Sequence, residues 1–118
     1  MALRPRDVLR IWDLYTSPNK PKLHICVCDE RQLFLRINSE PVFPPTHALS
    51  KASNPFLHHD SYVELQQLVR HMAYEIARAE HVGRLGRAEA KALVEAVQTA
   101  KTLSPEHKRL VAERLLGP

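Results

Sequence analysis

The residues best suited to chemistry lie in one short stretch, His58-His59-Asp60-Ser61, which opens directly into the apolar run 62–65. A carboxylate beside an imidazole fixes the tautomer of the ring and raises its basicity, so these side chains could form a general-base or nucleophile set. Side chains at the mouth of a strand are held by the sheet behind them and still face solvent. The stretch therefore predicts a binding or catalytic site that includes His58, His59, Asp60 and Ser61.

The spacing of these four residues also allows a purely structural interpretation. Neighbouring residues on a strand face opposite sides, so His58 could share a face with Asp60, and His59 with Ser61, but all four converge only if the backbone turns. In the structural interpretation, Asp60 and Ser61 hydrogen-bond to their own or neighbouring backbone where the strand begins.

Metal chemistry is a third interpretation, in which the two adjacent histidines bind zinc and His24 or His47 supplies a further ligand. Cys26 and Cys28 do not complete such a site, because no second cysteine pair is present. Two residues apart on a strand, they would point to the same face and form a poor disulfide. We expect them to be small buried hydrophobic residues, and we expect neither a metal nor a cofactor.

Composition places the chain among small globular proteins with a mild preference for anionic partners. The 118 residues are 44% hydrophobic and 25% charged, and the formal net charge is +4. One domain of this length can bury a core without disulfides or a metal. The cationic excess permits contact with RNA or DNA, although the cations alternate with acids along the predicted helices.

Three further observations exclude classes of protein. Residues 1–82 contain no glycine, so neither a Walker loop nor a dinucleotide-binding fingerprint can be written. No apolar run approaches the roughly 18 residues that a bilayer-spanning helix needs, which predicts no membrane contact. Residues 1–7 lack the apolar stretch of a signal peptide, which predicts a cytoplasmic protein.

The elements that would position these residues are mainly strands in the first part of the chain. Apolar and β-branched runs predict strands over residues 7–15, 23–28, 33–37 and 61–65. The proline-containing cluster 16–22 and the proline-rich stretch 38–55 predict loops, the second of them long and irregular. The front half of the chain is therefore predicted to form a small β-sheet that the last of these strands closes.

The second part of the chain is predicted to be helical. Residues 68–77 have apolar side chains at helical spacing, although a strand followed by one turn of helix would also fit. Gly83–Gly86 is predicted to be a linker. Residues 87–102 are predicted to form an amphipathic helix whose apolar stripe includes Ala88, Leu93 and Val97. Ser104 followed by proline predicts the start of a last helix that ends near residue 116.

This order resembles the SH3-like barrel toxins of the MazF/PemK type. Four places carry the resemblance: Arg6–Trp12, Lys20–Val27, Leu35–Ser39, and Ser61–Leu68 followed by Gly83–Gly86 and a helix. They are similar, respectively, to the family's opening Gly-Asp strand, its loop ending in Arg-Pro, its strand ending in Thr and Ser, and its late strand and Leu-Gly linker. Here no glycine precedes Asp7, and lysine stands where the family has arginine.

The resemblance implies metal-independent cleavage of single-stranded RNA, in which the ribose 2′-hydroxyl attacks the adjacent phosphate. Such a site needs a cation and a hydrogen-bond donor within reach of that phosphate. By position, Lys20 or Lys22 would replace the family's arginine, without its bidentate fork, and Asn38 or Ser39 would replace its threonine.

Substrate binding by such a protein would use exposed aromatic and cationic side chains on the sheet. Tyr15 and Phe43 are the aromatics that we expect to stack on bases, close to Lys20, Lys22 and Arg36. The resemblance further implies a homodimer held in check by an antitoxin protein.

The sequence thus predicts a single α+β domain over residues 1–118. A small, curved, antiparallel SH3-like β-barrel would occupy residues 1–68, and two or three C-terminal helices would occupy residues 69–118. The expected function is a toxin-like endoribonuclease, and the alternative is a non-catalytic binding module for protein or nucleic acid. An exposed pocket that joins Lys20 or Lys22 to Ser39 would favour the nuclease, whereas a filled or acidic cleft would favour the binding module.

Overall fold

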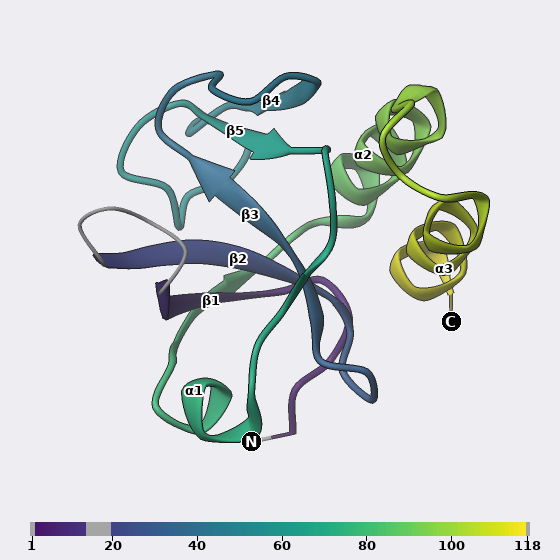
Figure 1. The fold of residues 1–118 in the computed structure, drawn as a ribbon. Coiled ribbons are helices and arrows are strands. Elements are labelled where there is room, and N and C mark those ends of the chain that lie inside the picture. The colour runs from purple at the N-terminus through teal and green to yellow at the C-terminus, as the bar shows by residue number, and fades with distance from the viewer. Residues whose placement is uncertain (1, 14–19, 118) are drawn as a thin grey trace.

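An open antiparallel sheet organises the chain in the computed structural model, which describes residues 2–13 and 20–117 (Figure 1). Its strands are β1 (Asp7–Asp13), β2 (Lys20–Cys28), β3 (Leu33–Asn38), β4 (Thr46–Leu49), β5 (Ser61–Glu64), β6 (Val69–Arg70) and β7 (Glu80–Arg84). The helices are α1 (Ala73–Ala77), α2 (Arg87–Thr99) and α3 (Pro105–Leu116). The predicted α+β class is confirmed.

The strand order explains why the sheet is strongly curved without being closed. Neighbours follow the order β4-β5-β3-β2-β1-β7, and the short β6 also pairs with β3. β5 pairs with the last residues of β3, at Ile37 and Asn38, whereas β6 pairs with its first residues, at Leu33 and Phe34. The sheet therefore bends around β3, and within the described residues its edge strands β4 and β7 do not meet.

Alternating side chains give the sheet two different cores. On one face, residues such as Val8 and Leu35 pack with apolar residues of α2 and α3, which cover this face on the right of Figure 1. On the other face, Leu9, Ile11, Cys26 and Phe34 form a smaller cluster against Ile76 and Ala79, in and just after α1. All six residues of β3 are buried because both faces of that strand are covered.

The two cysteines are structural, as predicted, but they do not share a face. Both are free and buried, and burial raises the pKa of Cys26. The β2–β3 register shifts between Cys26 and Cys28, so Cys28 packs in the larger core and Cys26 in the smaller one. A β-bulge of this kind breaks the period of two on which the same-face prediction depended.

Two predicted loops are partly strand. β2 begins at Lys20, inside the stretch predicted as a loop. Pro21 lies opposite Trp12 of β1, and β2 pairs with β3 only from His24 onward. A proline is compatible with such a one-sided strand segment. Within the predicted loop 38–55, Thr46–Leu49 pairs with β5 as β4.

The second half of the chain contains more sheet than predicted. Residues 68–77 are not one helix: they form the alternative arrangement, the short strand β6 followed by the single-turn helix α1. β7 pairs with β1 and was not predicted, because it is an edge strand with only one apolar aliphatic residue. The helix predicted over 87–102 ends at Thr99, and its buried stripe includes Ala90 and Val94 in place of the exposed Ala88.

The last helix is built as its sequence predicts. Ser104 is its N-cap and accepts a hydrogen bond from the His107 amide at 3.1 Å, with Pro105 in the first helical position. None of the helices in the described part of the chain is both long and apolar enough to cross a bilayer.

Gly83 gives a first testable prediction, because its missing side chain makes room for Phe56. A Cβ atom at Gly83 would lie 2.9 Å from the Cβ of Phe56, which packs against the larger core. We expect Gly83→Ser to lower the free energy of unfolding by about 1–3 kcal/mol, the usual cost of overpacking. Chemical denaturation of both proteins measures the difference.

Gly86→Ser is the matched control for this substitution. A Cβ at Gly86 meets no atom within 4 Å, and serine is a favoured residue at the N-cap position that Gly86 occupies. Its unfolding free energy should stay within a few tenths of a kcal/mol of the original. Equal losses for the two glycines would show that the Phe56 contact is not the cause.

Candidate functional site

A cleft of about 260 Å³ opens beside the end of the β1–β2 ladder, next to the loop that leads into β5. Its lining combines cationic, imidazole and hydroxyl side chains with a small apolar floor: Arg10, Lys20, Pro21, Lys22, Leu23, Ile37, Asn38, Ser39, Leu57, His58, His59 and Ser61. Among the described residues that line it, none is aspartate or glutamate.

The fold itself brings the predicted residues together. β2 and β3 are antiparallel neighbours, so the beginning of β2 lies beside the end of β3, where Asn38 and Ser39 follow Ile37. β5 pairs with the same end of β3 and carries the loop before it to the cleft. Seven predicted site residues therefore share one lining: Lys20, Lys22, Asn38, Ser39, His58, His59 and Ser61.

The loop before β5 is fixed on both sides of its histidines. Leu57 is buried in the larger core, which anchors the chain directly before His58. Asp60 accepts a hydrogen bond from the Lys51 amide at 2.9 Å, and Ser61 donates one to the His59 carbonyl at 3.0 Å. The structural interpretation is thus confirmed for Ser61, whereas Asp60 bonds to backbone nine residues earlier in the chain. Both histidines stay exposed at the cleft.

The backbone determines which nitrogen of His59 carries the proton when the ring is neutral. His59 Nδ1 lies 3.0 Å from the carbonyl oxygen of Asp60 and 3.3 Å from Ser61 Oγ. A carbonyl only accepts hydrogen bonds, so Nδ1 is the donor and Nε2 keeps the lone pair. His59 therefore presents a basic nitrogen that suits proton transfer.

Lys22 is the more enclosed of the two cleft lysines. It is half-buried, and its ammonium donates a hydrogen bond to Asn38 Oδ1. Burial lowers the pKa of Lys22, and the nearby charges of Lys20 and Arg36 lower it further. An ammonium in such a position interacts more strongly with an anion than one in bulk water does.

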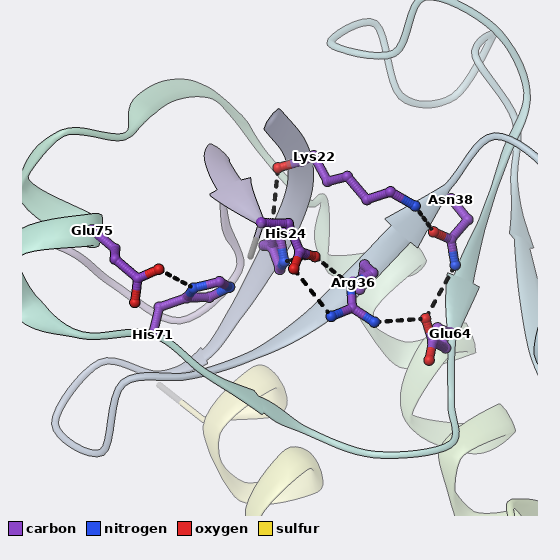
Figure 2. A network of polar contacts seen from close by, with 8 residues as sticks. Lys22, His24, Arg36, Asn38, Glu64, His71 and Glu75 are labelled. Atoms are coloured by element: carbon purple, nitrogen blue, oxygen red, sulfur yellow. Dashed lines mark hydrogen bonds and ion pairs between the residues drawn. The ribbon is translucent and has the colours of Figure 1, made fainter. Parts of the chain in front are cut away.

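Behind the cleft lies a buried network of charges (Figure 2). Asn38 Nδ2 donates to Glu64 Oε2 at 3.2 Å, and Arg36 Nη1 donates to the same oxygen at 3.2 Å. On its other side, Arg36 donates from Nε to Asp13 Oδ2 at 2.6 Å. The guanidinium thus joins two buried carboxylates, as buried charges require.

The network continues to a pair of buried histidines on the same face of the sheet. His24 Nε2 lies 3.5 Å from Asp13 Oδ2, and its ring makes an edge contact with His71 at 4.6 Å between centroids. His71 Nδ1 lies 3.5 Å from Glu75 Oε2 (Figure 2). Burial lowers the pKa of His71, and the neighbouring His24 ring lowers it further.

Other predicted site residues lie elsewhere. Arg36 is only 8% exposed, does not line the cleft, and is held in the buried network; Asp60 is exposed and is tied to the Lys51 amide. Phe43 is exposed but outside the cleft lining, and Tyr15 lies outside the described residues. A separate recess of about 310 Å³ is lined by Trp12, Tyr74, Glu75 and Arg78.

Sequence reasoning missed Arg10 at the cleft and Glu64 behind it. A usable signal was present, because Asp13, His24 and Arg36 each continue an otherwise apolar strand. A charged residue at such a position indicates that the face is covered and that it has a buried partner.

The metal interpretation finds no support in the described part of the chain. No group there brings together three or more histidine, cysteine, aspartate or glutamate side chains that could hold a metal ion. His24, proposed as a third ligand, is buried beside Asp13 and His71 instead of lying at the cleft.

The described lining of the cleft thus combines three cationic side chains with two histidines and no carboxylate. Comparison with known proteins adds nothing to this geometry: no family model matches the chain, and no curated protein matches its sequence.

Proposed function

We propose that the protein is a metal-independent endoribonuclease of the MazF/PemK toxin type, which cleaves single-stranded RNA in the cleft. The observation that supports this most is the lining itself: Lys20, Lys22 and Arg10 face the space with two histidines, and the described lining has no carboxylate. Such a surface attracts a phosphodiester. The open antiparallel sheet with C-terminal helices is compatible with a variant of the SH3-like barrel.

The reaction needs only groups that the cleft contains. A ribose 2′-hydroxyl loses its proton to a base and attacks the adjacent phosphorus, and the P–O5′ bond breaks as an acid protonates the leaving 5′-oxygen. The products are a 2′,3′-cyclic phosphate and a 5′-hydroxyl. His59, with its basic Nε2, and His58 are the proton-transfer groups in this proposal, and Lys22 and Ser39 stabilise the charged phosphorane.

The arrangement favours this function over the non-catalytic binding module. The binding module predicted a filled or acidic cleft, whereas this one is open and its described lining contains no acid. Arg10 is paired with Glu80, which leaves the two lysines as the principal phosphate ligands. As part of the same proposal, we expect a homodimer that an antitoxin protein inhibits.

Cleavage of a long unstructured RNA in EDTA tests the proposal. The RNA should contain all short base combinations, since the preferred sequence is unknown. We expect fragments that end in 2′,3′-cyclic phosphates, and we expect the DNA of the same sequence to remain intact because it lacks the attacking 2′-hydroxyl. RNA that is bound but not cut would favour the binding module, and cleavage that only a divalent metal restores would favour a metal-dependent hydrolase.

A further inference from the structure

Asn38 lies between two side chains that allow only one orientation of its amide. Lys22 can only donate hydrogen bonds, and an ionised Glu64 can only accept them. Accordingly, Asn38 Oδ1 accepts from Lys22, and Asn38 Nδ2 donates to Glu64 Oε2 at 3.2 Å. Turning the amide over would place its NH₂ group against the ammonium and its oxygen against the carboxylate. The two neighbours therefore determine the orientation.

Glu64 is in turn a fixed point. Its residue is 3% exposed, and Oε2 also accepts from Arg36 Nη1 at 3.2 Å. Arg36 is itself held by Asp13, whose residue is fully buried. A guanidinium that donates to two carboxylates restricts the movement of both. Glu64 thus presents a fixed acceptor to Asn38.

Lys22 depends on this arrangement for its position. A lysine side chain has a flexible four-carbon stem, so an ammonium at a cleft loses considerable rotamer freedom when it is held in place. The hydrogen bond to Asn38 holds the ammonium, and the bond between His24 Nδ1 and the Lys22 carbonyl, 2.9 Å long, holds the backbone.

We propose that Glu64 is a positioning residue: it fixes the amide of Asn38, and Asn38 in turn holds the Lys22 ammonium where a phosphate enters the cleft. The role of Lys22 toward phosphate rests on the proposed function, but the orientation of Asn38 does not. Asn38 accordingly acts on Lys22 and not on the substrate, which differs from the catalytic role that the sequence predicted for it.

The wild-type protein gives the first test, which needs neither a variant nor RNA. In NMR spectra of the labelled protein, the Asn38 Nδ2 protons should show nuclear Overhauser contacts to the Glu64 side chain, and these should be stronger than any to the Lys22 methylene next to Nζ. The reverse pattern, or two averaged orientations, would overturn the proposal whether or not the protein cleaves RNA.

A double-mutant cycle with Glu64→Leu and Asn38→Leu gives the second test, because leucine removes the acceptor oxygen that glutamine would keep. In the wild-type background, E64L should lower the kcat/KM of RNA cleavage by about 10- to 100-fold, because a small misplacement of a catalytic cation is costly. In the N38L background, E64L should change it by less than about 2-fold, since the connection is already broken. Equal losses in both backgrounds would mean that Glu64 acts by its charge alone.

The wild type, the two single variants and the double variant also allow a measurement that does not depend on catalysis. The titration of the Lys22 carbon next to Nζ, followed by NMR, should respond to E64L more in the wild-type background than in the N38L background. If the protein cleaves no RNA, the proposed function fails while this titration and the wild-type contacts still decide the positioning role. An equal response in both backgrounds would contradict that role.

Discussion

Replacing Arg36 with methionine is expected to lower the free energy of unfolding by about 3–5 kcal/mol, a large part of the stability of a small domain. Methionine keeps much of the apolar stem but removes the guanidinium that joins Asp13 and Glu64. Both carboxylates are nearly inaccessible to water and would then lack the cation that they share. Urea denaturation followed by circular dichroism measures the change.

Arg31→Met is the matched control for the Arg36 substitution. Arg31 Nη1 lies 3.4 Å from Glu106 Oε1, but both side chains are largely exposed, at 49% and 67%. Pairs of this kind contribute about 0–1 kcal/mol because water and salt screen them. A loss below about 1 kcal/mol for Arg36 as well would show that the buried network is not what stabilises this face of the sheet.

The second large effect is expected on catalysis: Lys22→Met should reduce RNA cleavage by about 10²- to 10³-fold, the usual result of removing one stabiliser of transition-state charge. The same substitution at Lys101, an exposed residue after α2, should leave the rate unchanged. Initial rates of cleavage in EDTA are the measurement, and thermal unfolding of each variant identifies any loss of fold. Equal rates for the wild type and Lys22→Met would remove Lys22 from the proposed site.

The pH dependence of cleavage gives this role of Lys22 a second check. Burial and the neighbouring cations Lys20 and Arg36 lower the pKa of Lys22 from the ordinary value of 10.5. The ammonium form is therefore lost, as pH rises, earlier than in an ordinary lysine. If the proposal holds, the rate should fall on the alkaline side at a pH below 10.5, after correction for spontaneous hydrolysis of RNA.

The strands with continuous apolar runs could be predicted, and the two that depend on their neighbours could not. β2 and β3 carry apolar runs because the sheet buries them on one or both faces. β4 and β7 lie at the edges of the sheet, where only one side needs a partner, so their sequences carry little alternation. The bulge in β2 likewise leaves no signal in the sequence, because it is set by the pairing with β3.

The cleft was partly predictable because it follows from one antiparallel pair. Once β2 and β3 are neighbours, the residues at the beginning of one strand and after the end of the other must lie together, which brings Lys22 near Asn38. The partners of Arg36 were not predictable in the same way. Glu64 belongs to β5 and Asp13 to β1, so these contacts require the two strands to lie on opposite sides of β3. They also require the second face of the sheet to be covered. Both conditions depend on long-range pairing of strands.

The pairing of β7 with β1 has a consequence for how the chain reaches this fold. During synthesis, β1 emerges before the other described strands, yet its neighbour on one side consists of residues 80–84, which emerge after all of them. Contacts between segments so distant in sequence slow folding, because a long loop must close before they form. Until residue 84 has left the ribosome, β1 remains an unprotected edge with open backbone hydrogen-bonding groups. The sheet is therefore completed late, and a nascent chain that stalls before β7 exposes its first strand to pairing with other chains.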